Sequence, residues 1–305
     1  LEFNARVLKQ ALNQQNPLLE RLQFLSIVSS NFDEFFQVRV AATKRALLHG
    51  EATTDESNYK PSVLLSKISK RAHEILDKQQ NCLVNEILPE LKQNNLEYIS
   101  LSDYTPLQKE YLHDIFKNEI YPLLTPLRTD TEVFPHIINL SKYVAFSLKP
   151  ISGIKTISKE LKGNDDAPRI ALVELPEKIQ NLIWLPTKSK KNKQFTIIDD
   201  VVQLFGTSLF PGFKVEETLL FKVTRDADFA VDEDSGKNFI HAMENVLIQR
   251  KSSFPVQMTC NNSSDKIKQF LMNKLELTSE DVYTINSILD PNCLMELRNY
   301  EDTNN

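Results

Sequence analysis

The chain of 305 residues carries 36 Lys and Arg against 41 Asp and Glu, for a formal net charge of −5, and 41% of its residues are hydrophobic. It contains no apolar run of the ~18 residues that a membrane span needs, and its first residues lack the layout of a signal peptide, so we expect a soluble, cytoplasmic protein of about two domains, with peripheral membrane association left open. Six dispersed glycines exclude a glycine-rich phosphate loop, and three distant cysteines exclude a disulfide framework.

Residues 1–92 predict an N-terminal all-α helical bundle. Apolar residues recur at helical spacing after Asn16 and Pro17, a pair typical of a helix start. The run at 29–31 predicts a break in this helix. A polar loop at 49–61 and a long amphipathic helix at 61–91 follow.

Residues 93–305 change in pattern and predict a mixed α+β domain, so that the chain as a whole belongs to the α+β class. Strands are predicted near 97 and at 143–150, 169–176, 182–186, 194–200, 220–231 and 254–260. Helices are predicted at 105–121, 198–209, 234–251 and 264–275. The lysine-rich run at 188–193 predicts a solvated hairpin loop.

The five histidines are dispersed and fall in no metal-binding or nucleophilic pattern, so we predict no catalytic residue and no metal site. The densest polar cluster is 224–234, and two interpretations stay open. In a strand, Asp226 and Asp228 would stand side by side, as a hard cation such as Mg²⁺ requires. We favour the alternative, in which the acidic run at 232–234 begins the helix at 234–251 and Arg225 pairs with a carboxylate.

Asn31 has two compatible candidate roles. With Glu34 it fits a capping box that restarts the helix after the predicted break. Its carboxamide both donates and accepts hydrogen bonds, so it could also bind an adenine edge or a phosphate. We expect Arg6, Arg21 and Arg39 to be the basic residues of the helical unit that lie nearest such a site.

Several long runs together resemble one protein family. They are FNARVL at 3–8, NPLLERLQFLSIVSSNFDEFFQVRVAA at 16–42, YPLLTPLRTD at 121–130, FPHIINLSKYVAFSL at 134–148, RIALVELP at 169–176, LFPGFKV at 209–215, FKVTRDADFAVDED at 221–234 and LELTSEDVYTINSILD at 275–290. They resemble the N-terminal and head domains of bacterial polyphosphate kinases of the histidine-phosphorylating type.

The resemblance implies a parent enzyme that reversibly transfers the terminal phosphate of ATP to polyphosphate through a phosphohistidine, leaving ADP. In this family the phosphohistidine, most of the nucleotide pocket and the Mg²⁺ ligands belong to two carboxy-terminal domains of phospholipase-D-like fold. We therefore expect the present segment to be inactive alone and to hold neither ATP nor Mg²⁺ tightly.

Two roles carry over from the resemblance. The asparagine of the family's SSN-x-DEF run contributes to the ATP site, and this residue is Asn31 here. The head domain mediates dimerisation, so residues 93–305 are expected to form a homodimer contact. The family assigns no catalytic role to Thr224, Arg225 and Asp226.

Two alternatives belong to other classes. One is a stand-alone, non-catalytic binding or scaffolding protein built from the same two domains. Nucleic-acid binding is the other, and the acidic charge disfavours it. The chain begins without methionine inside a predicted helix, which favours a segment of a longer protein.

Overall fold

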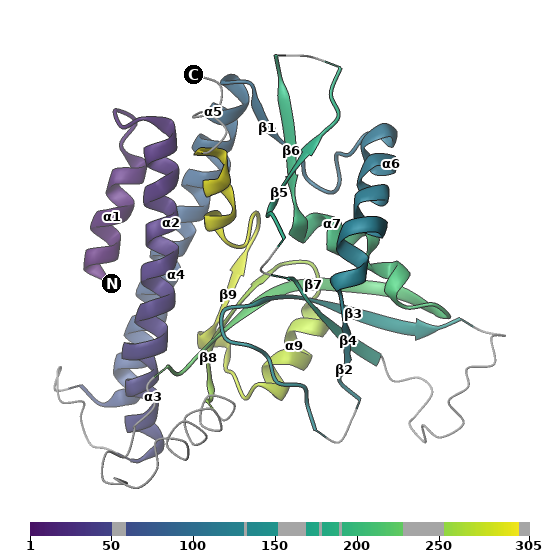
Figure 1. Ribbon diagram of the computed structural model, residues 1–305. Helices are drawn as coiled ribbons and strands as arrows, with labels where there is room; N and C mark the ends of the chain where they lie inside the picture. Colours follow the sequence, from purple (N-terminus) through teal and green to yellow (C-terminus); the bar gives the residue numbers. More distant parts are fainter. Residues whose placement is uncertain are drawn as a thin grey trace, which may run out of the picture.

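A computed structural model describes residues 1–50, 59–130, 133–151, 169–176, 179–188, 191–227 and 253–298. A helical bundle forms one side of the molecule, and two β-sheets with their covering helices form the other (Figure 1). The α+β class is therefore confirmed. None of the helices within these ranges combines the length and the apolarity needed to cross a membrane.

The bundle consists of long helices in which single turns of π-helix are inserted. A π-turn at Phe36–Val40 joins α2 to α3, and another at Leu83–Ile87 joins α4 to α5, so each pair forms one nearly continuous rod. The long helix predicted at 61–91 is confirmed. The bundle helices are α1 (Glu2–Leu12), α2 (Leu18–Phe35), α3 (Ala41–Leu48), α4 (Pro61–Cys82) and α5 (Leu88–Gln93).

The predicted break at 29–31 is wrong, because α2 runs through it without interruption. Partners across the bundle accommodate the polar residues. Gln79 of α4 donates to the Leu25 carbonyl at 2.7 Å and to the Ser29 hydroxyl at 2.8 Å. The capping box at Asn31 is wrong for the same reason, since a residue inside a continuous helix has no free backbone N–H to cap.

The larger sheet has the strand order β2-β4-β3-β7-β8-β9 within the described chain. Its β8–β9 pair is parallel, and its other pairs are antiparallel. These strands are β2 (Pro126–Arg128), β3 (Lys142–Pro150), β4 (Arg169–Glu174), β7 (Phe213–Arg225), β8 (Pro255–Asn261) and β9 (Val282–Ile285).

The smaller sheet has the order β1-β6-β5, with β1 parallel to β6 and β5 antiparallel to it. Its strands are β1 (Leu96–Tyr98), β5 (Leu182–Leu185) and β6 (Lys193–Ile197). The head region also contains the helices α6 (Pro106–Ile115), α7 (Ile198–Phe205) and α9 (Asp265–Lys274), a π-turn at Phe116–Ile120, and 3₁₀ turns at Tyr121–Leu123, Gly206–Leu209, Ser279–Asp281 and Pro291–Met295.

Helices cover both faces of the larger sheet. Val144 and Phe146 of β3 belong to a core that includes α6 and α7, whereas Tyr143 and Ala145 belong to a core that includes α9. Alternate residues of a strand point to opposite faces, so a strand covered on both sides becomes buried along most of its length. β3 and β4 are apolar almost throughout for this reason.

Most predicted strands are confirmed, with differences at their ends. β7 begins at Phe213, earlier than the predicted 220, because it pairs with the whole length of β3. The strand predicted at 194–200 ends at Ile197, where α7 begins. β2 and β9, of three and four residues, have too little pattern of their own to be predicted. The helix predicted at 234–251 lies outside the described residues.

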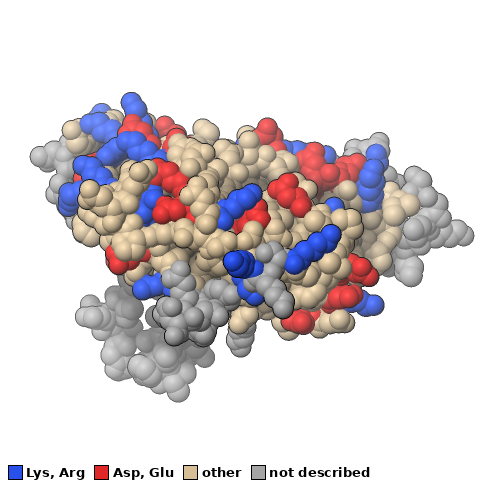
Figure 2. All heavy atoms as spheres, turned by 90° about the horizontal axis from the view of Figure 1, so that it is seen from above, with Lys and Arg blue, Asp and Glu red and all other residues tan. Residues whose placement is uncertain are grey.

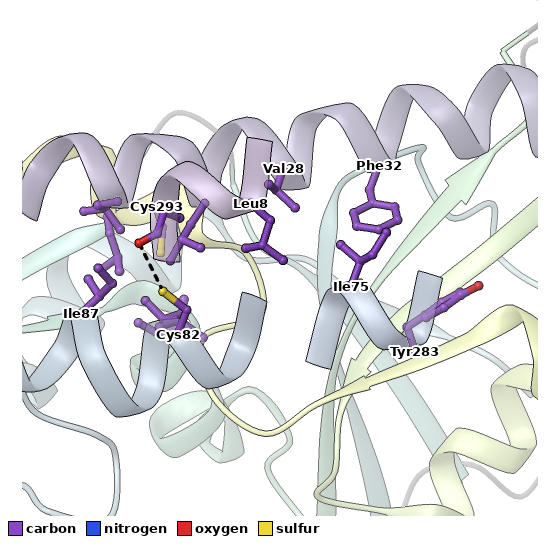
Figure 3. Close-up of a cluster of buried hydrophobic side chains, with 14 of the residues drawn as sticks. Leu8, Val28, Phe32, Ile75, Cys82, Ile87, Tyr283 and Cys293 are labelled. Carbon is purple, nitrogen blue, oxygen red and sulfur yellow. Dashed lines mark hydrogen bonds between the residues drawn. The ribbon is translucent and has the colours of Figure 1, made fainter. Parts of the chain in front are cut away.

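A third hydrophobic core contains residues of both the bundle and the sheets. Leu8, Val28, Phe32 and Ile75 come from the helices, and Tyr283 of β9 packs beside them (Figure 3). The ring centroids of Phe36 and Tyr283 are 5.4 Å apart. A two-residue turn at 94–95 links α5 to β1, and the same core contains Leu91 before it and Leu96 after it.

Candidate functional site

Three of the runs quoted above meet where α2 approaches the larger sheet. Gln37 lies at the end of the SSNFDEFFQVR run, and its Oε1 accepts a hydrogen bond from Asn139 Nδ2 at 2.9 Å. Asn139 Oδ1 in turn accepts one from the backbone N–H of Arg225 at 2.7 Å. The backbone N–H of Ala227 donates to the Gln37 carbonyl at 3.1 Å. Segments about 100 residues apart are thereby joined through side-chain amides.

A buried ion cluster strengthens the same junction. The Lys222 ammonium of β7 lies 2.9 Å from both carboxylate oxygens of Asp33 on α2 and 3.5 Å from Asp290 Oδ2. Burial raises the pKa of Asp33 in spite of the neighbouring ammonium. Burial opposes the charge on Lys222, but Asp290 and Asp33 together raise the pKa of this lysine above its ordinary value. Lys222 therefore keeps its charge at neutral pH.

The cavity beside this cluster is small. It has about 30 Å³ and is lined by Asp33, Gln79, Lys222, Gln257 and Asp290, among others. Small-molecule sites usually have ~300 Å³ or more. This cavity therefore has no room for a nucleotide, and the ion cluster holds α2 against the larger sheet.

Asn31 lies two residues before Asp33 on the same helix and is half-buried. Its Nδ2 donates to Asn4 Oδ1 of α1 at 3.2 Å, and Asn4 Nδ2 donates to the Val28 carbonyl at 3.0 Å. The described residues provide no hydrogen bond to Asn31 Oδ1. One end of the carboxamide is therefore oriented by the bundle, while its acceptor oxygen remains available.

The structure gives Arg21 a role inside the bundle. Its side chain is 2% exposed. Nε donates to the Ala11 carbonyl at 2.7 Å, Nη1 donates to Glu90 Oε2 at 2.8 Å, and Nη2 pairs with Glu86. The guanidinium therefore ties α2 to α1 and to the end of the α4–α5 rod, and we leave Arg21 out of the site.

Arg6 and Arg39 differ from Arg21 because both are exposed. The Arg6 guanidinium lies 5.8 Å from the centroid of the Phe3 ring on α1. Arg39 belongs to the π-turn that follows α2. On the face drawn in Figure 2, Lys and Arg side chains gather most densely toward the left, the side on which α1 and α2 lie in Figure 1.

The acidic motif after β7 is only partly described, because Asp228 and 232–234 lie outside the described ranges. Asp226 pairs with Arg45 of α3. The Arg225 guanidinium donates to the carbonyls of Ile137 and Ser253, so the expected pairing of Arg225 with a carboxylate is wrong. These main-chain oxygens surround the guanidinium because a bulge interrupts the β7–β8 ladder here. No group of three His, Cys, Asp or Glu in the described chain could hold a metal ion.

Comparison with known proteins identifies the family. A model of the polyphosphate kinase N-terminal domain matches residues 1–99, and a model of the polyphosphate kinase middle domain matches residues 107–297. The chain belongs to the polyphosphate kinase family.

Relatives cover nearly all of the chain. The polyphosphate kinase of Bacillus anthracis is 33% identical over 301 residues, which are 97% of this chain and 42% of that protein. Polyphosphate kinase 1 of Chlorobaculum tepidum is 31% identical over 300 residues, with the same two coverages. The crystal structure of polyphosphate kinase from Porphyromonas gingivalis has the same fold, with a TM-score of 0.70 at 23% identity, and covers 96% of this chain and 39% of its own. The chain thus spans about two fifths of the length of these polyphosphate kinases.

The junction described above joins the two polyphosphate kinase domains, since Asp33 lies in the first match and Lys222 and Asp290 lie in the second. Sequence reasoning missed these three residues and Asn139. A usable signal existed for Lys222, which is the one charge in the run LLFKVT. Charges in such positions are rarely buried without a partner.

Proposed function

We propose that this chain is the N-terminal and head part of a polyphosphate kinase that reversibly transfers the terminal phosphate of ATP to polyphosphate. Asn31 contributes to its ATP site. The observation that supports this assignment is the oriented carboxamide, whose Nδ2 is held by Asn4 and whose Oδ1 is open. An amide in this state can accept a hydrogen bond from the adenine amino group and still donate its second N–H.

Arg6 and Arg39 are the basic residues that we propose near the phosphates. Both are exposed on the bundle, and a guanidinium binds phosphate oxygens through two parallel hydrogen bonds. The phosphohistidine and the Mg²⁺ ligands are assigned to other domains of the enzyme. To this chain we assign binding and orientation, and no nucleophile.

Substitution of Asn31 in the full-length kinase tests the ATP assignment. A lost hydrogen bond of about 1 kcal/mol corresponds to roughly fivefold weaker ATP binding for Asn31→Ala. Asn94→Ala is the matched control, because it removes an exposed amide that bonds only to the Glu90 carbonyl. Equal ATP affinity of Asn31→Ala and the unchanged enzyme would remove this residue from the site.

A second experiment tests whether the phosphorylated histidine lies outside this chain. The 305-residue chain is incubated with ATP labelled on its terminal phosphate and assayed for acid-labile phosphohistidine. We expect no labelled protein. Incorporation of label into this chain would contradict the assignment of the nucleophile to other domains.

We further propose that the head region forms a homodimer contact. Supporting this, four large apolar side chains on α6 and the 3₁₀ turn after it are exposed: Leu107, Tyr111, Tyr121 and Leu123. Leu107 and Tyr111 lie four residues apart on α6 and therefore on one face of it, and exposed apolar patches mark association surfaces. Sedimentation equilibrium of the full-length kinase should show weaker dimerisation for Leu107→Glu and no change for Leu48→Glu on the bundle. Equal dimerisation of both variants would rule out this face.

A further inference from the structure

A second cavity, of about 410 Å³, opens between the two sheets, and Asn31 is not part of its lining. Its lining comes from the segments that follow four strands: 100–102 after β1, 198–203 after β6, 261–263 at the end of β8 and 286–289 after β9. β1 is parallel to β6, and β8 is parallel to β9. Ligands of α/β proteins commonly bind at the carboxyl ends of parallel strands, and ~300–1,000 Å³ is the usual volume of such sites.

The polar lining of this cavity is oriented by hydrogen bonds. Serine hydroxyls and side-chain amides make up most of it. Asn261 Nδ2 donates to Gln203 Oε1 at 3.0 Å, while Asn261 Oδ1 accepts from the Leu220 backbone at 3.1 Å and from the Ser263 hydroxyl at 2.7 Å. Isoleucine and leucine side chains form the apolar wall. The cavity therefore offers both hydrogen-bonding groups and a surface for methylene groups.

Asp200 at the start of α7 is the one carboxylate in this lining, and no Lys or Arg accompanies it. Its side chain is buried, and the Tyr98 hydroxyl donates to Oδ2 at 2.6 Å. The other two buried aspartates of the described chain have cationic partners, since Asp199 pairs with Lys142 and Asp226 pairs with Arg45. Asp200 forms no ion pair with the described residues.

A buried carboxylate without an ion-pair partner is unfavourable, and a cation that enters the cavity would relieve this cost. Burial raises the pKa of Asp200 to about 7, and the neighbouring Asp199 acts in the same direction, while the Tyr98 and Thr196 hydroxyls and the Lys142 ammonium, which pairs with Asp199, oppose the rise. A phosphate or a nucleotide would meet a negative charge and no basic residue. A divalent metal ion would find one carboxylate where it requires several ligands. A neutral polyol would leave Asp200 uncompensated.

We infer that this cavity binds a small aliphatic amine, whose ammonium group pairs with Asp200 and donates to the surrounding amide and hydroxyl oxygens. Its methylene groups lie against the isoleucine and leucine wall. The lining includes neither Asn31 nor the charged residues Asp33, Lys222 and Asp290, although Ile285 and Leu289 also line the small cavity beside that ion cluster.

Isothermal titration of the 305-residue chain with 1,4-diaminobutane tests the inference, with 1,4-butanediol as the uncharged control. We expect a dissociation constant near ~1 mM or below for the diamine and no binding of the diol. Binding should strengthen from about pH 6 to about pH 8, because Asp200 ionises over this range. Equal binding of the diol, or no binding of the diamine, would overturn the inference.

Variants assign the binding to this cavity. Asp200→Asn should weaken diamine binding by at least about tenfold and abolish its pH dependence, because a charge-assisted hydrogen bond is lost. Asp77→Asn, which removes an exposed carboxylate from α4, should leave affinity unchanged. Asn286→Trp should block the cavity from its exposed rim without touching Asp200. Unchanged affinity in both Asp200→Asn and Asn286→Trp would place the amine elsewhere.

Discussion

The ion cluster between α2 and β7 should control the stability of the whole chain. Replacing Lys222 by methionine keeps the side chain's volume and removes its charge. Lys222 is 7% exposed and Asp33 is 18% exposed, so the variant leaves a nearly buried carboxylate without a cation. Breaking a buried ion pair from one side costs about 3–5 kcal/mol, against about 5–15 kcal/mol for the total stability of a domain. Lys222→Met should therefore fold but unfold at much lower denaturant concentration.

The pH dependence distinguishes this cause from simple loss of packing. In Lys222→Met, burial still raises the pKa of Asp33, and no ammonium opposes it. A carboxyl group with a raised pKa in the folded state binds more protons there than in the unfolded state, so stability falls as pH rises toward the folded pKa. The cost of Lys222→Met should thus be smaller at about pH 5 than at about pH 8.

Urea unfolding followed by circular dichroism at both pH values measures these effects. Lys222→Met/Asp33→Asn should recover part of the lost stability, because it removes the uncompensated charge. Lys78→Met, an exposed lysine on α4, is the matched control and should change stability little. A cost for Lys222→Met of under about 1 kcal/mol, equal at both pH values, would show that the cluster behaves like an exposed pair and would refute the reasoning.

Three further predictions concern other buried groups. Arg21→Met should destabilise the chain by about 3–5 kcal/mol in urea unfolding, because Glu86 and Glu90 lose their buried partner. A cost of under about 1 kcal/mol, as for an exposed ion pair, would contradict the role assigned to Arg21. Gly206→Ala should lower the free energy of unfolding by about 1–3 kcal/mol, since a Cβ there would lie 2.5 Å from Phe146 Cζ. The double variant Gly206→Ala/Phe146→Leu should recover part of this loss, and an unchanged stability of Gly206→Ala would show that the contact relaxes freely. The free energy of unfolding should fall as pH rises from about 4 to about 7, because the folded pKa of Asp200 is raised to about 7, and Asp200→Asn should remove this fall. An unchanged dependence of stability on pH in the variant would show that another group causes it.

Local patterns predicted much of the fold because their cause is local. The 3.6-residue period of apolar residues located the helix at 61–91, and β-type runs located β3, β4 and β8. The same reasoning failed at 29–31, where Ser29 accepts a hydrogen bond from Gln79 of α4 and Asn31 donates one to Asn4 of α1. A pattern confined to one helix contains no information about such a partner.

The chain's sequence by itself determined the α+β class and the family, because these depend on local periodicity and on long continuous motifs, and it predicts the candidate role of Asn31. Only the tertiary structure decided which charges are buried. Lys222 and Asp33 are 189 residues apart in sequence, and Arg21 and Glu90 are 69 apart. Whether a charged side chain remains in water or pairs inside the molecule depends on what the fold brings next to it. The free energy of such a pair depends on how far the fold buries both charges.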